Sequence, residues 1–414
     1  MGLEGRRVLF ISYNGMLDPL GQTQVLPYLR TLTQKGVQYT LLSFERPKAY
    51  ERDGVEKCEA LQTKLSAEGI DWHRLPYHQR PSLPATAYDV LAGIRYARKL
   101  VRNNKIELIH ARSHIPATIA LSLKKQLGIK MIFDLRGLMA EEYVDAGHWK
   151  KGSTAYRITK TAERRIFAGT DAIVTLTERI WPIIKDWDGL RGRTIHHAVI
   201  PCCADLTLFK FNSDDRSRIR TELNLGDRFT FVYSGSLDGW YLTEEMADFF
   251  GYVLGQRSKA HMLWLTNGKP QRVKELMSAR GISEDSYSVR SVAAATVPSY
   301  LSAGDIGLAF IKQCFSKLAS SPTKNGEYLA CGLPLLLNSG VGDSDQLIKE
   351  WKAGVLVDNF TRDEYSRALR QIEAIACDPE AKTEARNVAE RLFDLESIGG
   401  ERYADLYERV LDVQ

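Results

Sequence analysis

The sequence predicts an α/β protein of two doubly wound domains, each with a parallel sheet that helices cover on both faces. Short apolar runs alternate along the chain with longer segments of helical periodicity. The runs are apolar on both faces, which is typical of parallel strands buried between two helix layers. A polar, charged stretch at 201–228 separates the runs into two series, so we expect two domains whose sheets face a central cleft.

The strands and domain boundaries follow from this alternation. The first series of predicted strands occupies 8–12, 39–44, 107–111, 131–135, 172–177 and 194–200. The second series occupies 229–235, 261–266, 287–292, 305–311, 334–338 and 354–358. With a linker near 201–215, we predict an N-terminal domain over 1–205 and a C-terminal domain over 206–390. The charged amphipathic segment 391–414 is predicted to form a helix that crosses back to the N-terminal domain.

The composition excludes several classes of protein. Of the 414 residues 44% are hydrophobic and 26% charged, so a sizeable core is expected and wholesale disorder is not. A formal net charge of +5 is too mild for a nucleic-acid-binding polycation, although it suits an anionic ligand or membrane surface. Six cysteines without a CxxC pattern predict a reducing, cytoplasmic compartment. No apolar stretch is long enough to span a membrane.

The segment SSPTKNGEYLACGLP, residues 320–334, has the strongest local pattern. Ser321 is a good N-cap residue and a proline follows it at the first helical position. Gly332 is a typical residue just after a helix, and the next proline prevents continuation. We therefore predict a short helix over 322–331.

Two residues of this helix break local rules. Lys324 puts a cation in the first turn, where the helix dipole disfavours it, and Gly326 lowers helix stability. Both are explained if an anion binds at this N-terminus, where Lys324 would pair with it and Gly326 would let it approach the backbone. Glu327, three residues after the lysine, can accept hydrogen bonds from vicinal hydroxyls such as those of a ribose. A solvated Lys–Glu pair on an ordinary helix is the alternative.

Two further junctions join a strand to a helix through glycine. In 232–250 the strand leads into Gly235 and Ser236, and in 11–36 it leads into a loop with Gly21. Such junctions cradle phosphates in many folds, and in others they only turn a corner. Neither has the GxGxxG spacing, and no GxxxxGK[ST] occurs, so the dinucleotide fingerprint and the P-loop are excluded.

The helices after these two loops are predicted from their first turns. One is expected to begin near Thr243, where two glutamates suit a helix N-terminus. The other is expected to begin near Thr23, because Pro27 is tolerated only within a first turn.

Charged residues also follow the strand predicted at 131–135. The loop FDLRGLMAEEYVDAGHW contains Arg136, Glu142 and Asp145, just past the end of the strand, where ligands of such sheets bind. A polar loop with internal ion pairs is the alternative interpretation.

No pattern argues for a metal ion. His110 and His114 are four residues apart, but the first lies in a predicted strand, so they share no helix face. Asp343 and Asp345 resemble a DxD pair, yet their place before a helix is explained by the preference for acidic residues there. We predict that no metal is bound.

The helix predicted over 91–105 has a strongly basic face. The cations are Arg95, Arg98, Lys99, Arg102 and Lys105. Such a helix either lies on an anionic membrane surface or simply covers the sheet. Both interpretations remain open.

The stretch KNGEYLACGLP, 324–334, resembles the donor-binding signature of family 4 glycosyltransferases, which have the GT-B fold of two Rossmann-like domains. The N-terminal glycine loop, the loop after 229–235 and the stretch 297–310 fall in the family's order. The resemblance, closest to members that make surface polysaccharides, implies a retaining, hexosyltransferase-like enzyme. It would move a sugar from a nucleotide-diphosphate sugar to a hydroxyl of a glycan, a lipid-linked glycan or a small molecule, without a metal or other cofactor.

The resemblance also implies roles for individual residues. The implied donor-binding residues are Gly21, Gly235, Ser236, Arg290, Val292, Ser321, Thr323, Lys324 and Glu327. The implied catalytic residues are Arg136, Glu142 and Lys324. By this analogy Glu327 binds the donor ribose, Lys324 and the amides around Gly235 face the diphosphate, and 290–292 holds the base.

Three positions depart from the family's pattern. Ala319 stands where a second glutamate is common. The stretch Leu237-Asp238-Gly239-Trp240-Tyr241 stands where an arginine and a lysine are common after the loop. Arg136 stands where a histidine is common. Lys324 is then expected to carry more of the phosphate charge. A nucleotide-sugar epimerase of the same fold and a non-catalytic nucleotide-sugar-binding protein are the alternatives. A lipid-linked acceptor would place the protein peripherally on the inner face of the membrane.

Overall fold

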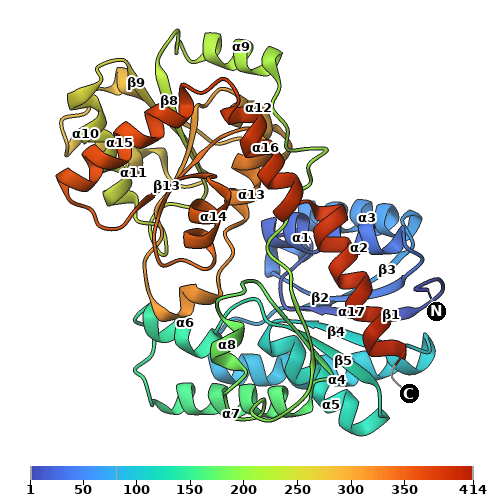
Figure 1. Cartoon of the computed structure of the whole chain (residues 1–414). Coiled ribbons are helices and arrows are strands. Elements are labelled where there is room, and N and C mark those ends of the chain that lie inside the picture. The colour runs from blue at the N-terminus through green and yellow to red at the C-terminus, as the bar shows by residue number, and fades with distance from the viewer. Residues whose placement is uncertain (1, 81, 413–414) are drawn as a thin grey trace. The chain divides into compact units, whose positions relative to one another are not determined.

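The computed structural model describes residues 2–80 and 82–412 and has two compact units (Figure 1). The first unit comprises Met1–Pro201 together with Leu395–Gln414, and the second comprises Cys202–Asp394. Each contains one fully parallel sheet with helices between successive strands. This confirms the predicted fold class of two Rossmann-like α/β domains.

The sheet of the first unit has seven strands in the order β3-β2-β1-β4-β5-β6-β7. They are β1 (Arg7–Ser12), β2 (Gln38–Glu45), β3 (Ile70–Pro76), β4 (Leu108–Arg112), β5 (Lys130–Asp134), β6 (Ala172–Thr175) and β7 (His196–Val199). Strand β1 lies between β2 and β4, so the chain changes direction across the sheet there. The carboxyl ends of all these strands share one edge.

Helices and short turns connect these strands. They are α1 (Pro19–Gln24), α2 (Leu26–Thr33), η1 (Pro47–Tyr50), α3 (Arg52–Ala67), α4 (Ser82–Asn103), α5 (His114–Leu127), α6 (Met139–Asp145), α7 (Thr154–Gly169), α8 (Trp181–Ile184), the π-helical turn η5 (Leu395–Gly400) and α17 (Glu401–Asp412). The single helix predicted from Thr23 is wrong, because the segment forms α1 and α2 with a break at Val25. Pro27 does lie in the first turn of α2, as predicted.

The sheet of the second unit has six strands in the order β10-β9-β8-β11-β12-β13. They are β8 (Phe229–Ser234), β9 (Ala260–Leu265), β10 (Tyr287–Arg290), β11 (Ile306–Ala309), β12 (Leu335–Asn338) and β13 (Gly354–Val357). The connecting elements are α9 (Ser213–Glu222), α10 (Thr243–Gln256), α11 (Pro270–Ser278), η2 (Glu284–Ser286), η3 (Ala294–Thr296), α12 (Val297–Ser302), η4 (Phe315–Ala319), α13 (Thr323–Ala330), α14 (Ser344–Trp351), α15 (Arg362–Ala376) and α16 (Ala381–Leu392).

This second sheet is buried on both faces. Along β8, Val232 belongs to one hydrophobic core and its neighbours Phe231 and Tyr233 belong to the other. Along β9, Leu263 and Trp264 divide in the same way. Since neighbouring residues of a strand point to opposite faces, strands covered on both sides must be apolar throughout, which explains why the runs were visible in the sequence.

Every predicted strand is present, and β3 is the strand that the sequence analysis missed. It lies at the edge of the first sheet, and only Ile70 and Trp72 of its residues are buried. The chain leaves the first unit at 201/202, where we predicted 205/206, and returns at 394/395, where we predicted 390/391. The later return follows from α16, which packs against α13, whereas α17, red in Figure 1, packs on β7.

None of the described helices combines the length and the apolar character that a membrane-spanning segment requires.

Candidate functional site

Two of the motifs singled out in the sequence meet at the carboxyl edge of the second sheet. Strand β8 lies between β9 and β11, so successive connections run in opposite directions from it. Open α/β sheets bind ligands beside the carboxyl ends of the strands at such a point. Gly235 follows β8 directly, and α13 carries Lys324 to the same place.

Lys324 is buried although it is a lysine, with 6% of its surface exposed. Its Nζ atom lies 3.6 Å from the ring centroid of Tyr241 and 4.4 Å from that of Tyr233. Among the described residues, Nζ has no hydrogen-bond partner. The two aromatic rings attract the ammonium through their π faces and use none of its three N–H donors. The donors therefore stay free for an anion.

Gly235 makes room for this ammonium. A Cβ atom at this position would lie 2.7 Å from the Nζ of Lys324, and the residue has a φ of +152°. Its N–H donates to the Leu265 carbonyl at 2.9 Å, so this amide is not directed at a ligand as the resemblance implied. The Ser236 carbonyl accepts a hydrogen bond from the Tyr233 hydroxyl, and this bond fixes the Tyr233 ring beside Lys324. Gly235 thus contributes space, because a side chain there would displace the ammonium.

Lys324 and Glu327 have strongly shifted pKa values. Burial lowers the pKa of Lys324 to about 7, against the opposing effect of the Glu327 carboxylate. Burial raises the pKa of Glu327 to about 7, against the opposing effect of Lys324. Both groups therefore exchange protons near neutral pH, and an anion bound beside Lys324 would favour the charged lysine.

The helix that carries this pair begins one residue later than predicted. Helix α13 is Thr323–Ala330, and its N-cap is Pro322. The predicted cap, Ser321, instead accepts a hydrogen bond from the Cys202 N–H at 3.1 Å. Thr323 is the first helical residue and is half-buried. Gly332 follows the helix with a φ of +74°, as predicted.

The explanation that we gave for Gly326 is wrong. A Cβ atom there would lie 2.9 Å from the Cβ of Phe393, so the glycine serves helix packing and not the approach of an anion. Tyr328, on the same helix, accepts a hydrogen bond from the Ser234 N–H at 2.7 Å. These contacts fix α13 against the end of β8. They thereby fix the position of Lys324 relative to the carboxyl edge of the sheet.

Sequence reasoning missed the aromatic residues that hold cations in this site. Trp240 and Tyr241 end the stretch 237–241, in which the resemblance would place an arginine and a lysine. In the structure, a lysine from elsewhere in the chain lies over each of these rings. The Nζ atom of Lys317 is 3.9 Å from the Trp240 ring centroid, and that of Lys324 is 3.6 Å from the Tyr241 ring centroid. The positive charge is thus supplied by the segment before and within α13. Only the composition of the loop hinted at this, because the paired residues are far apart in sequence.

The residues proposed to hold a base lie on the same edge of the sheet. Arg290 ends β10, and its guanidinium donates to the Val289 carbonyl at 3.0 Å. Val292 follows in a loop and is half-buried. Since β10, β9 and β8 are parallel neighbours, these residues lie two strands away from Gly235 along one edge.

In the first unit, Arg136 lies beside a buried carboxylate. Its Nη1 atom is 3.6 Å from Oδ1 of Asp134, the last residue of β5. Burial alone would raise the pKa of Asp134, but the Arg136 guanidinium and a hydrogen bond from His110 lower it to about 2. Tyr403 also donates to this carboxylate, at 3.2 Å. The loop after β5 therefore starts from a fixed ion pair.

The other predicted residues of the first unit have mainly packing explanations. A Cβ atom on Gly21, in α1, would lie 2.3 Å from the Gly15 carbonyl oxygen, so a close backbone contact accounts for this glycine. Glu142 lies on α6, and a Cβ atom on Gly137 would be 2.7 Å from its Oε1. The carboxylate thus folds back over the turn after Arg136.

The histidines and aspartates considered as metal ligands are engaged within the protein. His110 contacts Tyr407 and Asp134, and His114 contacts Glu163 at 3.2 Å. Asp345 accepts from the Gly340 N–H at 3.1 Å. Within the described part of the chain, no three His, Cys, Asp or Glu residues are grouped as metal ligands.

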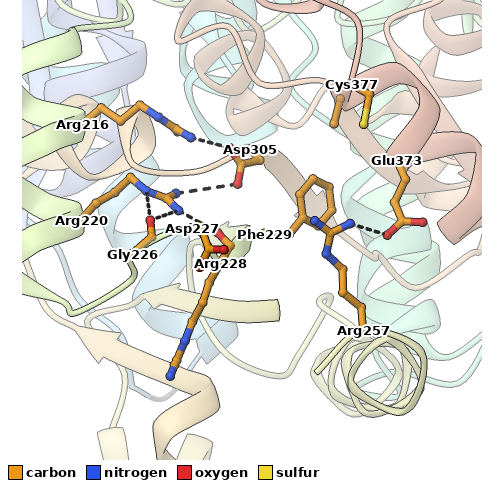
Figure 2. A pocket seen from close by; sticks show the side chains of 11 residues that line it. Arg216, Arg220, Gly226, Asp227, Arg228, Phe229, Arg257, Asp305, Glu373 and Cys377 are labelled. Atoms are coloured by element: carbon orange, nitrogen blue, oxygen red, sulfur yellow. Dashed lines mark hydrogen bonds and ion pairs between the residues drawn. The ribbon is translucent and has the colours of Figure 1, made fainter. Parts of the chain in front are cut away.

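An arginine-rich pocket of about 340 Å³ lies at the opposite, amino edge of the second sheet. Figure 2 shows Arg216 and Arg220 directed at Asp305, and Arg257 directed at Glu373. Phe229, the first residue of β8, also lines it. The guanidinium groups that line it are bonded to carboxylates and backbone carbonyls. These bonds connect α9, α10 and α15 to the sheet. The pocket offers a ligand no unpaired cation, unlike Lys324.

Comparison with known proteins agrees with this architecture. Residues 21–208 match the sequence profile of Glycosyltransferase Family 4. No curated protein sequence gives a significant match.

Many solved structures resemble the chain over nearly its whole length. Sucrose-phosphate synthase from Thermosynechococcus elongatus has a TM-score of 0.71 at 14% identity, over 99% of this chain and 100% of that chain. A glycosyltransferase from Rickettsia africae has a TM-score of 0.74 at 11% identity, over 99% of both chains. Anabaena HepE in complex with UDP has a TM-score of 0.67 at 16% identity, over 97% of this chain and 100% of that chain. At these identities the likeness concerns the fold.

Proposed function

Because residues 21–208 match the profile of glycosyltransferase family 4 and the two units have the GT-B fold, we propose that this chain transfers a sugar from a nucleotide-diphosphate sugar to a hydroxyl acceptor, with retention of configuration and without a metal ion. One observation carries the proposal. The buried ammonium of Lys324, with no hydrogen-bond partner in the described chain, stands beside a glycine turn at the carboxyl edge of the second sheet.

Lys324 would act on the leaving group. Glycosyl transfer passes through an oxocarbenium-like state while negative charge builds on the departing diphosphate. A fixed cation in a site of low dielectric stabilises that charge far better than water does, because it needs no reorganisation. The N-terminus of α13 adds its partial positive charge. This local supply of positive charge supports transfer without a metal.

The other donor contacts follow from the same edge of the sheet. Glu327, one turn after Lys324, would accept hydrogen bonds from the ribose hydroxyls when it is ionised. Ser321 and Thr323 lie at the start of α13 and would border the diphosphate, with the Ser236 backbone opposite. The stretch from Arg290 to Val292 would border the base.

The first unit would provide the acceptor side. Arg136 is held by Asp134 at the end of β5 and would position the acceptor or the diphosphate. Glu142 would assist the acceptor hydroxyl as a base. The acceptor classes that we propose are a glycan, a lipid-linked glycan or a small hydroxyl compound.

A donor screen is the first experiment. Sugars of UDP, GDP, dTDP and ADP would be compared by thermal shift, because the correct donor stabilises the protein most by mass action. UDP-glucose comes first, since HepE was solved with UDP and with UDP-glucose. Incubation of the best donor alone then separates the alternatives, because an epimerase makes a new sugar-nucleotide without any acceptor. Tight binding without turnover on any acceptor pool would instead indicate a non-catalytic binding protein.

The role of Lys324 is tested by substitution. Lys324→Ala should lower the transfer rate by about 10²-fold, the typical effect of removing one preorganised donor to a developing negative charge. Lys349→Ala, an exposed lysine on α14, is the matched control and should stay at the wild-type rate. Activity in excess chelator should also be unchanged. A Lys324→Ala rate within about twofold of wild type would refute the assignment.

We further propose that α4 contacts an anionic membrane. Leu83, Tyr88 and Leu91 in its first half are exposed at 46%, 60% and 67%. Exposed cations follow, namely Arg95, Arg98, Lys99, Arg102 and, just after the helix, Lys105. An apolar patch beside a basic stripe suits the surface of an anionic bilayer.

Vesicle flotation tests this contact. The protein should bind vesicles that contain phosphatidylglycerol and not those of phosphatidylcholine alone, and salt should weaken the binding. Arg95→Glu with Arg102→Glu should abolish it, since each basic residue near such a surface contributes about 1 kcal/mol. Equal binding to both kinds of vesicle, or none to either, would contradict the proposal.

A further inference from the structure

A buried polar network joins the last helix to the strand end that holds Arg136. Asp134, the last residue of β5, is 2% exposed, and side chains from three other segments of the first unit contact its carboxylate. Tyr403 comes from α17, His110 comes from β4, and Arg136 follows β5 by two residues. Of these residues, the proposed function uses Arg136, and it gives the others no role.

The two oxygens of the Asp134 carboxylate have different partners. Oδ2 accepts a hydrogen bond from the Tyr403 hydroxyl at 3.2 Å, and Nε2 of His110 lies 3.4 Å from the same oxygen. Oδ1 faces Nη1 of Arg136 at 3.6 Å and has no hydrogen-bond partner among the described residues. The terminal torsion of an aspartate is soft, so the contacts on Oδ2 decide where Oδ1 lies and thus where it attracts the guanidinium.

The last helix acts on Asp134 by a second route, through His110. Burial lowers the pKa of His110, against the opposing effect of Asp134, so the ring is neutral at pH 7. Asp134, with a pKa of about 2, is ionised and only accepts hydrogen bonds, so the single ring proton lies on Nε2. Nδ1 then accepts from the Tyr407 hydroxyl, which lies 2.5 Å away. Tyr403 therefore contacts the carboxylate directly, and Tyr407 acts on it through the imidazole.

The Tyr403 ring is held by packing that does not depend on its hydroxyl. It lies edge-to-face against the Tyr28 ring, with the centroids 5.6 Å apart, and its centroid is 5.2 Å from that of the His110 ring. The residue is 3% exposed. A phenylalanine at this position would keep the packing, and the change would remove one hydrogen bond to the Asp134 carboxylate.

We infer that Tyr403 is a positioning residue for the transfer reaction: its hydroxyl holds the Asp134 carboxylate in the orientation that fixes Arg136. A cation assists the reaction only where it meets the reacting groups, and a displacement of about 1 Å can lower the rate strongly. The last helix then contributes to the reaction through a buried carboxylate, without touching a substrate itself. The inference rests on the proposed function, because that function gives Arg136 its role.

NMR on the full-length protein with ¹⁵N-labelled arginine tests the positioning without turnover. The Nε–H resonance of Arg136 is identified by its loss in Arg136→Lys, and its heteronuclear NOE reports the order of the side chain on the ps–ns timescale. Tyr403→Phe should lower this NOE toward the values of exposed arginines, because the carboxylate can turn. Tyr28→Phe is the matched control and should leave Arg136 unchanged. It also removes the hydroxyl of a buried tyrosine, here one that donates to the Pro201 carbonyl at 3.1 Å.

Transfer kinetics test whether this position matters for the reaction. Tyr403→Phe should lower kcat by about fivefold to tenfold, the effect of one hydrogen bond, and Tyr28→Phe should keep the wild-type value. The same change is then made in an Arg136→Gln background, where the cation is already absent. There Tyr403→Phe should have no further effect on kcat, because two residues that act through one group are not additive. A purely structural role of Tyr403 would lower kcat by the same factor in both backgrounds.

The two measurements separate this inference from the proposed function. If Arg136 is as ordered in Tyr403→Phe as in wild type, Tyr403 does not position it and the inference is refuted, whatever the activity. An unchanged kcat, or an equal loss in both backgrounds, refutes it as well, while the transferase activity still stands. If Arg136 loses its order in Tyr403→Phe but the wild-type protein turns over no nucleotide-sugar, the link from Tyr403 to Arg136 stands and the proposed function fails.

Discussion

Lys324 is buried at a cost to stability that the fold does not recover. The residue is 6% exposed, and its buried ammonium lies against the rings of Tyr241 and Tyr233 with no hydrogen-bond partner in the described chain. Cation–π attraction offsets part of the desolvation, but an unpaired buried charge is strongly disfavoured. The free protein should therefore be more stable without this lysine.

Replacement of Lys324 by methionine should therefore stabilise the free protein. Methionine keeps the length of the side chain and has no charge, so the free energy of unfolding should rise by about 1 kcal/mol or more at pH 7. The unfolded chain holds the lysine proton up to a pH of about 10.4, whereas the folded chain releases it near 7. Between these values the unfolded state binds more protons, so the protein with Lys324 gains stability as pH rises. The difference in the free energy of unfolding between the Lys324→Met variant and wild type should therefore narrow toward pH 10.

Urea denaturation in a Glu327→Gln background isolates this effect. Removal of the carboxylate leaves Lys324 as the only group of the pair that titrates. Glu327→Gln is compared with the same chain carrying Lys324→Met as well, in steps from pH 7 to pH 10. A stability difference that is constant over this range, or a methionine variant that is less stable at pH 7, would show that the ammonium has an unseen partner.

At the residue scale, the sequence predicted the groups that break local rules and missed those that act through distant pairing. Lys324 and Gly235 stood out because each is unfavourable or unusual in its own segment, and the structure brings them within contact distance. Tyr241 gave no local sign, since its partner Lys324 is remote in sequence. Gly326 was noticed for the right reason and explained wrongly, because its neighbour Phe393 lies in another element.

At the scale of elements, α13 is positioned by close packing and not by its own helix propensity. Its Tyr328 hydroxyl accepts from Ser234, and the same ring faces Gly307 of β11, where a Cβ atom would be 2.3 Å from the ring. Gly326 lets Phe393 approach from the other side. Close packing thereby fixes the helix on two sides. The position of Lys324 relative to the sheet therefore depends on the two glycines, Gly307 and Gly326.

Gly326→Ala should accordingly destabilise the protein, although alanine favours a helix by about 1 kcal/mol. The added methyl would lie 2.9 Å from the Cβ of Phe393, so the backbones of two elements must separate. Gly251→Ala in α10 is the matched control, because its added methyl meets only the end of Ile282 at 3.6 Å and should stabilise. Thermal denaturation of both variants gives the comparison. If the two substitutions shift Tm in the same direction, packing does not explain Gly326.

The elements themselves were largely predictable from hydrophobic pattern. Strands buried on both faces read as apolar runs, and the structure confirms every run that was predicted. Strand β3 was not predicted from the sequence because an edge strand buries few residues, here Ile70 and Trp72. Its polar positions interrupt the apolar run. The break between α1 and α2 escaped because Gly21 packs against Gly15, a contact between segments that no local pattern shows.

At the scale of the whole molecule, the chain returns to its first unit to complete a buried polar network. Helix α17 buries Tyr403 and Tyr407 against this unit. The Tyr407 hydroxyl lies 2.9 Å from that of Tyr39 and 2.5 Å from Nδ1 of His110. His110 and Tyr403 both contact Asp134, the partner of Arg136. The last helix is therefore part of what holds the loop after β5.

Removal of the residues after Asp394 should unfold the first unit and spare the second. The truncation takes away Tyr403, Leu406, Tyr407 and Val410, each at most 3% exposed, and leaves His110 and Asp134 buried with fewer partners. A buried polar group that loses its partner costs about 1–3 kcal/mol, and the lost apolar area adds to this. The second unit ends at Asp394 and keeps both of its hydrophobic cores.

Hydrogen exchange followed by mass spectrometry resolves the two units in one sample. Amides of β1, β4 and β5 should lose protection in the truncated chain, whereas those of β8, β9 and β11 should keep it. Tyr407→Phe in the full chain is the milder variant: it removes one hydroxyl and no apolar area, so β4 should lose part of its protection while the unit stays folded. Because α17 contacts the first unit through both its apolar face and these hydroxyls, the two variants separate the contributions. Unchanged protection of β1 and β4 in the truncated chain would show that the first unit folds without its last helix.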